Sequence, residues 1–146
     1  MTTLSSEAIE KLKTNVKGRA VLPDDQSYDE VRAIWNATID RRPAVIVQCA
    51  AADDVPSAIA FARENGLEIS IRGGGHNIAG NAVCDNGVTI DLSTMTNVRV
   101  DVQKRRAYVE PGATLGDFDK AAQAHGLATP VGVNSTTGIA GLTLGG

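Results

Sequence analysis

The sequence predicts a mixed α/β or α+β domain, because short apolar strands alternate with amphipathic helical segments. A strand–helix–strand succession over residues 44–71 and a period-two alternation from Val98 to Val102 carry this prediction. Gly accounts for 15 of the 146 residues, above its usual share of roughly 7%. We therefore expect a mixed sheet with unusual glycine loops, and not a doubly wound sheet.

Residues 1–42 predict a helical leader. Residues 5–17 have apolar positions at helical spacing, which is typical of a short amphipathic helix. A second helix is expected from Ser27, which has a glutamate three residues later at the spacing of a capping box. Trp35 is expected to anchor that helix by packing. Pro43 ends the leader, since the residue before a proline is disfavoured in a helix.

A β-α-β unit is predicted next. Residues 44–47 form a continuous apolar run, which is typical of a strand buried on both faces. Asp53 and Asp54 stand where they can cap a helix, and Gly66 stands where that helix can end. Residues 67–71 return as a strand, so we expect a parallel pair. The core stripe of the helix is predicted to be Val55, Ile59 and Ala62.

The rest of the chain predicts a strand, a hairpin and a capped helix. Residues 88–92 indicate the strand, and residues 98–102 and 106–110 indicate an antiparallel hairpin across a basic turn. Thr114 begins a helix at a second capping signal, and Gly126 ends it. The buried positions of this helix are predicted to be Leu115, Phe118 and Ala122.

Composition excludes several classes of function. The net charge is −3 and aromatic residues make up 3% of the chain, so no electrostatic or stacking surface for nucleic acid is expected. Cys49 and Cys84 are too few for a disulfide framework or a cysteine zinc site, and no metal site is predicted. No apolar stretch suggests a membrane span or a signal peptide, so we expect a cytoplasmic protein.

Two glycine-dense segments point to a ligand. In residues 72–77 three glycines leave no Cβ in the way, so successive amides can converge on an anion, with a positive charge from Arg72. Residues 132–146 are rich in small and hydroxylated residues, which let the backbone approach a flat or extended ligand closely. Neither segment contains the P-loop or the Rossmann glycine pattern. From these residues alone, a tight turn and an elongated phosphate-containing ligand are both open.

Four ordered motifs resemble the FAD-binding domain of the vanillyl-alcohol oxidase / p-cresol methylhydroxylase (PCMH) superfamily, and most of all the berberine-bridge-enzyme-like flavoproteins. The motifs are residues 71–77, 91–93, 109–113 and 138–146. The resemblance covers residues 43–146. It implies a PCMH-type FAD-binding domain, incomplete at its C-terminus, with a small β-α-β lobe and the start of a second mixed-sheet lobe.

The resemblance also implies a site. Residues 72–77 would wrap the FAD pyrophosphate, and residues 132–146 would line the flavin. His76 would bond covalently to a ring methyl, a reaction that suits a neutral imidazole as nucleophile. Asn134 stands where bicovalent relatives carry a cysteine, so one link is expected. The implied cofactor-binding residues are Arg72, Gly73, Gly74, Gly75, His76, Asn77, Asn134, Thr136, Thr137, Gly138, Gly141 and Leu142.

The function implied is that of an FAD-linked oxidase or dehydrogenase. Such an enzyme takes a hydride from a small organic substrate, for example at a CH–OH group, and passes the electrons to oxygen or another acceptor. No catalytic residue is expected here, because the family's catalytic tyrosine comes late in the chain, and this fragment alone is expected to be inactive. Two alternatives stay open: a reductase of the enolpyruvyl-sugar type, which His76 opposes, and a flavin-binding module without turnover.

Overall fold

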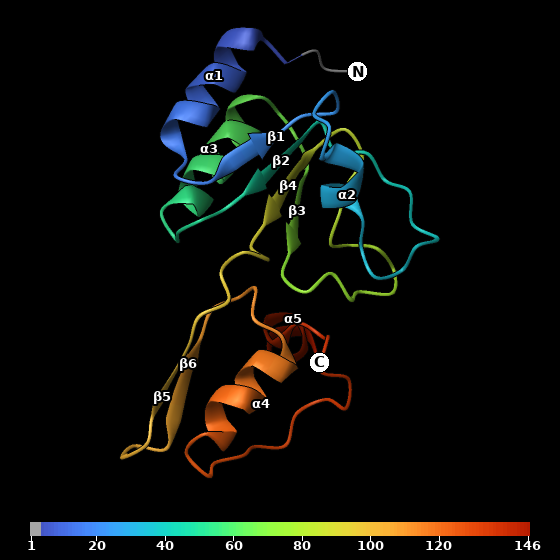
Figure 1. Ribbon diagram of the computed structural model, residues 1–146. Helices are drawn as coiled ribbons and strands as arrows, with labels where there is room; N and C mark the ends of the chain where they lie inside the picture. Colours follow the sequence, from blue (N-terminus) through green and yellow to red (C-terminus); the bar gives the residue numbers. More distant parts are fainter. Residues whose placement is uncertain (1–3) are drawn as a thin grey trace.

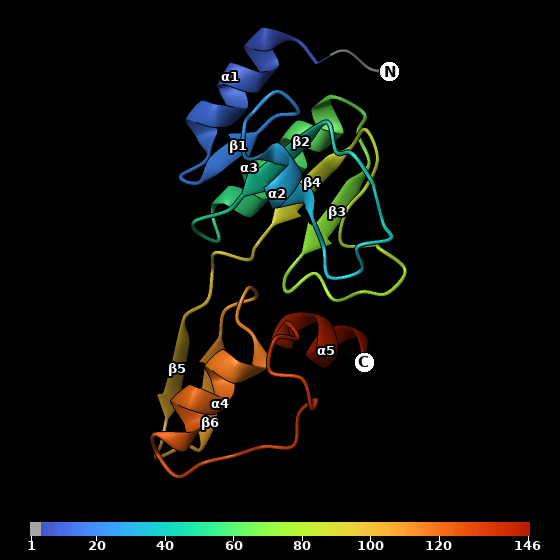
Figure 2. The same ribbon diagram turned by 45° about the vertical axis from the view of Figure 1, so that its right-hand side comes forward.

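The computed structural model describes residues 4–146, which form two lobes stacked one above the other (Figures 1 and 2). The helices are α1 (Ser6–Asn15), α2 (Tyr28–Arg32), α3 (Asp54–Glu64), α4 (Leu115–Gln123) and α5 (Ile139–Gly145). The strands are β1 (Arg19–Val21), β2 (Val45–Gln48), β3 (Ile69–Arg72), β4 (Val88–Asp91), β5 (Val98–Asp101) and β6 (Arg106–Val109). The mixed α/β class predicted from the sequence is confirmed.

The first lobe is built on a four-stranded mixed sheet with the strand order β1-β2-β4-β3. β2, β4 and β3 run parallel, and β1 adds an antiparallel edge to β2. The predicted strands around α3 are therefore parallel, but they are not neighbours. β4 lies between them, with Val88 opposite both Val45 and Ile69. All three parallel strands consequently end at one edge of the sheet, where the loops that follow them meet.

Period-two alternation divides the core between the two faces of this sheet. Val45 and Val47 pack with the apolar sides of α1 and α3, including Phe61. Ile46, between them in sequence, faces the other way and packs with Tyr28 from α2. This is the arrangement of a strand buried on both faces, as the continuous apolar run predicted. In α3 the predicted stripe is partly wrong, since Ile59 is exposed and Phe61 and Ala58 take the core positions.

The second predicted helix is far shorter than expected. α2 ends at Arg32, because continuing it would require the Trp35 N–H to donate to the Val31 carbonyl. That carbonyl instead accepts from the Arg72 guanidinium, and the Trp35 N–H donates to Gly75. Ser27 makes no cap, so the predicted capping box is also wrong; its hydroxyl accepts from Arg19 at 3.2 Å. Tertiary partners have replaced the helical ones. β1 and α5 were not predicted from the sequence.

A polar row crosses the carboxyl edge of the sheet on the α2 side. Its members are register partners on adjacent strands: Arg19, Gln48, Asp91 and Arg72. Arg19 donates to Gln48 at 2.7 Å, and Gln48 donates to Asp91 at 3.0 Å. Asp91 is fully buried, and its carboxylate lies 3.9 Å from the Arg72 Nε. The row fixes the point from which the glycine loop after β3 departs.

The second lobe consists of the antiparallel β5–β6 hairpin, α4 and α5. α4 has the predicted capping box, in which the side chains of Thr114 and Asp117 each bond the other's backbone N–H. Its predicted core residues Leu115, Phe118 and Ala122 are buried. Among the helices of residues 4–146, none is long and apolar enough to cross a membrane.

Asp54 joins the amino-terminal segment to the start of α3. Its buried carboxylate accepts backbone N–H bonds from Lys17 at 2.7 Å, Ala50 at 2.8 Å and Gly18 at 3.0 Å. Burial works to raise the pKa of Asp54, but these backbone donors outweigh it, and the pKa is lowered from its ordinary value of 3.8. The predicted capping of α3 by Asp53 or Asp54 is wrong, because neither carboxylate accepts an N–H of the helix. Asp54 instead joins two backbone segments that precede the helix, residues 17–18 and 50–51.

Asp54→Asn is expected to lower the free energy of unfolding by about 2 kcal/mol at pH 7, because the charge-assisted bonds are lost. A carboxylate with a depressed folded pKa stabilises the protein above its unfolded pKa of about 4 and loses this effect as the pH falls through and below that value. The difference between wild type and variant should therefore shrink below about pH 4 in urea titrations. The matched control is Asp53→Asn, whose exposed carboxylate pairs with Lys17 and should matter by less than about 0.5 kcal/mol. Equal losses in both variants would contradict this assignment.

Candidate functional site

A cavity of about 570 Å³ lies where the two lobes meet. Its walls come from the loop after β3, residues 73–77, and from the segment that begins α5, residues 137–142. In Figures 1 and 2 the loop after β3 hangs from the lower edge of the first lobe, directly above α5. The carboxyl edge of a parallel sheet is a common position for ligand sites, and a cavity of this size suits a small molecule or cofactor.

The lobes touch through two glycines. A Cβ on Gly74 would lie 2.4 Å from the Gly138 N and 2.5 Å from its Cα, and a Cβ on Gly138 would meet Gly74 at 2.5 Å. A Cβ on Gly73 would likewise lie 2.7 Å from the Pro111 carbonyl oxygen. Of the three successive glycines, only Gly75 has a positive φ, at 68°. Gly73 and Gly74 are thus required for close backbone approach, and Gly75 for its left-handed backbone conformation.

The loop after β3 presents a run of unpaired backbone donors. Within residues 4–146, no N–H of the five residues from Gly73 to Asn77 donates a hydrogen bond to another residue. All five residues line the cavity, and Gly75 is buried. A buried backbone N–H group is almost always hydrogen-bonded, so the N–H of buried Gly75 indicates a ligand acceptor, and the half-buried Gly73, Gly74 and His76 offer further donors beside it. Consecutive N–H groups in a turn are a known anion-binding arrangement.

His76 is the one ionisable side chain on the cavity wall. Its imidazole stacks on the Trp35 indole, with ring centroids 5.4 Å apart and planes inclined by 22°. Its Nε2 lies 3.4 Å from the Thr136 hydroxyl, which comes from the second lobe. The ring is thus held between a residue of the leader and a residue of the second glycine segment. Sequence reasoning missed Trp35 here, because its spacing predicted a helix anchor; instead its side chain is 60% exposed.

Arg72 lies beneath the loop and outside the cavity wall. Its Nη1 donates to the Val31 carbonyl, and its Nε is buried beside Asp91 without a hydrogen bond to any described residue. A Cβ on Gly75 would come within 3.4 Å of that Nε. The guanidinium therefore supports the loop from the protein side. That Arg72 also adds charge to a cofactor phosphate stays a prediction.

Asn134 shapes the second loop. Its carbonyl oxygen Oδ1 accepts from the Thr136 hydroxyl at 2.9 Å and from the Thr136 N–H at 3.1 Å. The Asn134 amide thus fixes the position of the Thr136 hydroxyl, which contacts His76. Cys84 is buried at the opposite end of the sheet, with its Sγ 4.0 Å from the Thr89 hydroxyl near the start of β4. No thiol of residues 4–146 lines the cavity.

This geometry agrees with comparisons to known proteins. The FAD binding domain family matches residues 43–146. The chain belongs to the FAD-binding domain family. Among curated relatives, the chain is 38% identical over 132 residues to (R)-6-hydroxynicotine oxidase of Paenarthrobacter nicotinovorans, and 32% identical over 134 residues to berberine bridge enzyme-like 18 of Arabidopsis thaliana. These alignments cover 90% and 85% of the chain, but only 29% and 25% of the relatives.

Solved structures agree with the assignment. The crystal structure of 6-hydroxy-D-nicotine oxidase from Arthrobacter nicotinovorans matches with a TM-score of 0.87 and 35% identity, over 96% of this chain and 30% of that one. Berberine-bridge-enzyme-like 1 of Physcomitrella patens matches with a TM-score of 0.87 and 25% identity, over 94% of this chain and 30% of that one. The resemblance to berberine-bridge-enzyme-like flavoproteins is confirmed. The chain spans between 25% and 30% of the length of these relatives.

The FAD-binding domain brings most of the predicted residues together. Nine of them line the cavity: Gly73, Gly74, Gly75, His76, Asn77, Thr137, Gly138, Gly141 and Leu142. Three do not line it, namely Arg72, Asn134 and Thr136. Arg72 donates to the Val31 carbonyl, Asn134 accepts from Thr136, and Thr136 contacts His76. The apolar part of the wall includes Ile71, Leu92 and Leu144, which lie within the sequence motifs but were not named individually as cofactor-binding residues. Unpaired donors beside an apolar wall fit a dinucleotide with a flat ring system, so the residues present suit FAD.

Substitutions at two glycines of the FAD-binding domain should distinguish an effect on loop packing from an effect on ligand contact. Gly74→Ala should lower both thermal stability and FAD affinity, because its methyl would meet Gly138. At Gly141 an added Cβ meets nothing within 4 Å, although the residue lines the cavity. Gly141→Ala should therefore keep the melting temperature within about 2 °C and weaken FAD binding. FAD affinity is measured by fluorescence titration. Unchanged affinity in both variants would contradict the assignment of the FAD site to this cavity.

Proposed function

We propose that this chain is the part of an FAD-linked oxidoreductase that holds the cofactor. The run of unpaired N–H groups from Gly73 to Asn77 carries the proposal, because it offers donors to the cofactor pyrophosphate without any cationic side chain. The segment from Thr137 to Leu142 forms the opposite wall. Bound FAD supplies the hydride-accepting chemistry, and the protein supplies position and surroundings.

We further propose a single covalent link between His76 and a ring methyl of the flavin. The new bond joins an imidazole nitrogen to the methyl carbon. One N–H and one C–H hydrogen leave with two electrons and reduce dioxygen to hydrogen peroxide, which balances the reaction. The position of His76 on the cavity wall supports this proposal. With Nε2 facing the Thr136 hydroxyl, Nδ1 is the nitrogen without a hydrogen bond within residues 4–146.

The activity proposed for the whole protein is oxidation of a small organic molecule. The substrate would lose a hydride, at a CH–OH or similar group, and oxygen or another acceptor would take the electrons. The relatives named as hydroxynicotine oxidases and as berberine bridge enzyme-like 18 support this class of reaction. Within residues 4–146 we assign no acid–base residue for a substrate, so we expect no turnover from this chain alone. Cytoplasmic location is part of the proposal, and both cysteines are unpaired thiols.

His76→Ala is expected to abolish covalent attachment and leave part of the FAD affinity, because the backbone donors remain. The native polypeptide that carries this sequence should retain its flavin in trichloroacetic acid, and the variant should release it. Peptide mass spectrometry should find the flavin mass on the peptide that contains His76 and on no other.

The control is His125→Ala, which removes the chain's other histidine at an exposed position after α4. It should behave as wild type in both measurements. Wild-type flavin that is fully released by acid would refute the covalent link and favour a non-covalent flavoprotein. Flavin found on a cysteine peptide would refute His76 as the linking residue.

A further inference from the structure

Residues 33–41 of the leader pack against the loop that carries the proposed attachment site, although they precede the part matched by the FAD-binding domain family. The backbone N–H of Trp35 donates to the Gly75 carbonyl at 3.2 Å. One residue later, the Asn36 side-chain amide donates to the Ile78 carbonyl at 2.8 Å. Two successive leader residues are thus bonded to the backbone on both sides of the attachment residue.

The far end of the leader is fixed to the same loop. Arg41 donates to the Gly80 carbonyl at 3.2 Å and to the Val83 carbonyl at 3.0 Å. A Cβ on Gly80 would lie 2.8 Å from the Ile39 side chain, so the two segments are in close contact there as well. The loop after β3 is therefore held along its length by the leader and not only by the sheet.

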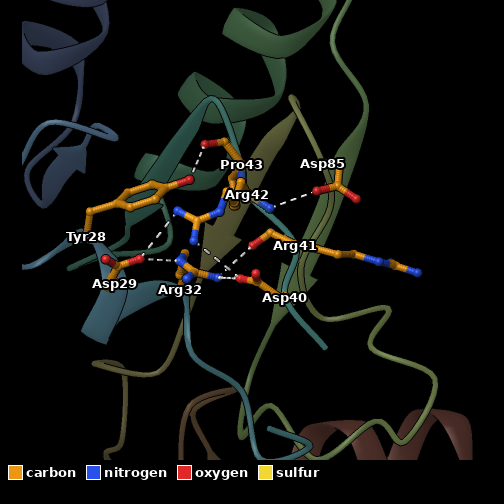
Figure 3. A network of polar contacts seen from close by, with 8 residues as sticks. All are labelled: Tyr28, Asp29, Arg32, Asp40, Arg41, Arg42, Pro43 and Asp85. Carbon is orange, nitrogen blue, oxygen red and sulfur yellow. Dashed lines mark hydrogen bonds and ion pairs between the residues drawn. The ribbon is translucent and has the colours of Figure 1, made fainter. Parts of the chain in front are cut away.

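A polar network fastens the leader itself (Figure 3). Tyr28 donates its hydroxyl proton to the Pro43 carbonyl at 2.7 Å, which closes the segment at its base. The Arg32 guanidinium pairs with Asp29 and with Asp40, across the bend that follows α2. The Arg32 side chain is only 14% exposed, so this pairing is shielded from water on one side. The bend that presents Trp35 is consequently fixed at both ends.

Trp35 occupies its position for a reason other than burial. Its side chain is 60% exposed, so the hydrophobic effect accounts for little of its placement. Its ring lies on the His76 imidazole at a centroid distance of 5.4 Å, within the range of favourable offset stacking. Thr136 contacts the edge of the same imidazole. The indole thus restricts the plane of the ring, and the hydroxyl restricts its rotation within that plane.

We propose that Trp35 is a positioning residue for flavin attachment, and that it acts by holding the His76 ring in the orientation needed for bond formation. The inference rests on the covalent link proposed above. A reacting group must be held to within roughly 10–20° of its productive orientation, and a half-buried histidine on a glycine loop is not restricted to that degree by its own backbone. The stack on Trp35 supplies the missing restriction from outside the matched domain.

The test compares the rate of covalent FAD incorporation in Trp35→Ala, Trp35→Phe and Tyr108→Ala. Tyr108 is an exposed aromatic residue on β6 that stacks on Arg99, far along the chain from the site, and serves as the matched control. Each native-length apoprotein is mixed with saturating FAD, and acid-stable flavin is measured over time. Trp35→Ala should slow incorporation about two- to tenfold. Trp35→Phe should restore most of the rate, and Tyr108→Ala should match wild type.

A second measurement does not depend on flavin. In the native polypeptide without flavin, the carbon-bound imidazole protons of His76 and His125 are assigned from the NMR signals lost in His76→Ala and His125→Ala, and His125 is the internal reference. Trp35→Ala should shift the His76 signals by removing the indole ring current and leave those of His125 in place. Unmoved His76 signals, or wild-type incorporation rates in Trp35→Ala, would overturn the role of Trp35. Wild-type protein without acid-stable flavin would instead refute the covalent link on which that role rests.

Discussion

The backbones of Gly74 and Gly138 lie so close together that neither residue has room for a side chain. This contact joins the two lobes. On one side the loop leaves the sheet at β3. On the other, the Thr137 carbonyl accepts from the Leu115 N–H at 2.9 Å, which attaches the second segment to the start of α4. The cavity lies along this seam. Its width is consequently set by backbone contact, and larger residues at either glycine would open the seam before they touched a ligand.

The polar row at the carboxyl edge of the sheet explains why that loop can be rich in glycine and still be fixed. Buried Asp91 is bonded to Gln48 and lies beside Arg72, so the last residue of β3 is held from within the protein. Arg72 then reaches the Val31 carbonyl and ends α2. A single arginine thereby links the sheet, the glycine loop and the leader. An arginine next to a glycine loop resembles an anion ligand in sequence; here its Nη1 also donates to a backbone carbonyl of the protein.

Sequence patterns predicted well wherever a local rule decided the structure. The apolar run of β2 and the capping box of α4 are both governed by neighbours in sequence, and both were correct. The helix expected from Ser27 failed because Val31 and Trp35 find hydrogen-bond partners that are distant in sequence. The glycine motif located the site, but the sequence alone did not show that Gly73 and Gly74 are needed for close approach to another segment and only Gly75 for a positive φ. Contacts between segments, such as the stack on His76, leave no periodic trace in a sequence.

The surroundings of Cys49, Cys84 and His76 explain why we expect a single covalent link to the cofactor. A thiol reacts as its thiolate, and burial, with Asp54 and Asp91 nearby, raises the pKa of Cys49 to about 11. Cys84 is buried beside the start of β4, whereas the cavity lies at the carboxyl ends of the parallel strands. Only the imidazole of His76 is both on the cavity wall and reactive as a neutral group. The proposed link therefore depends on one side chain, which Trp35 of the leader and Thr136 of the second loop both contact.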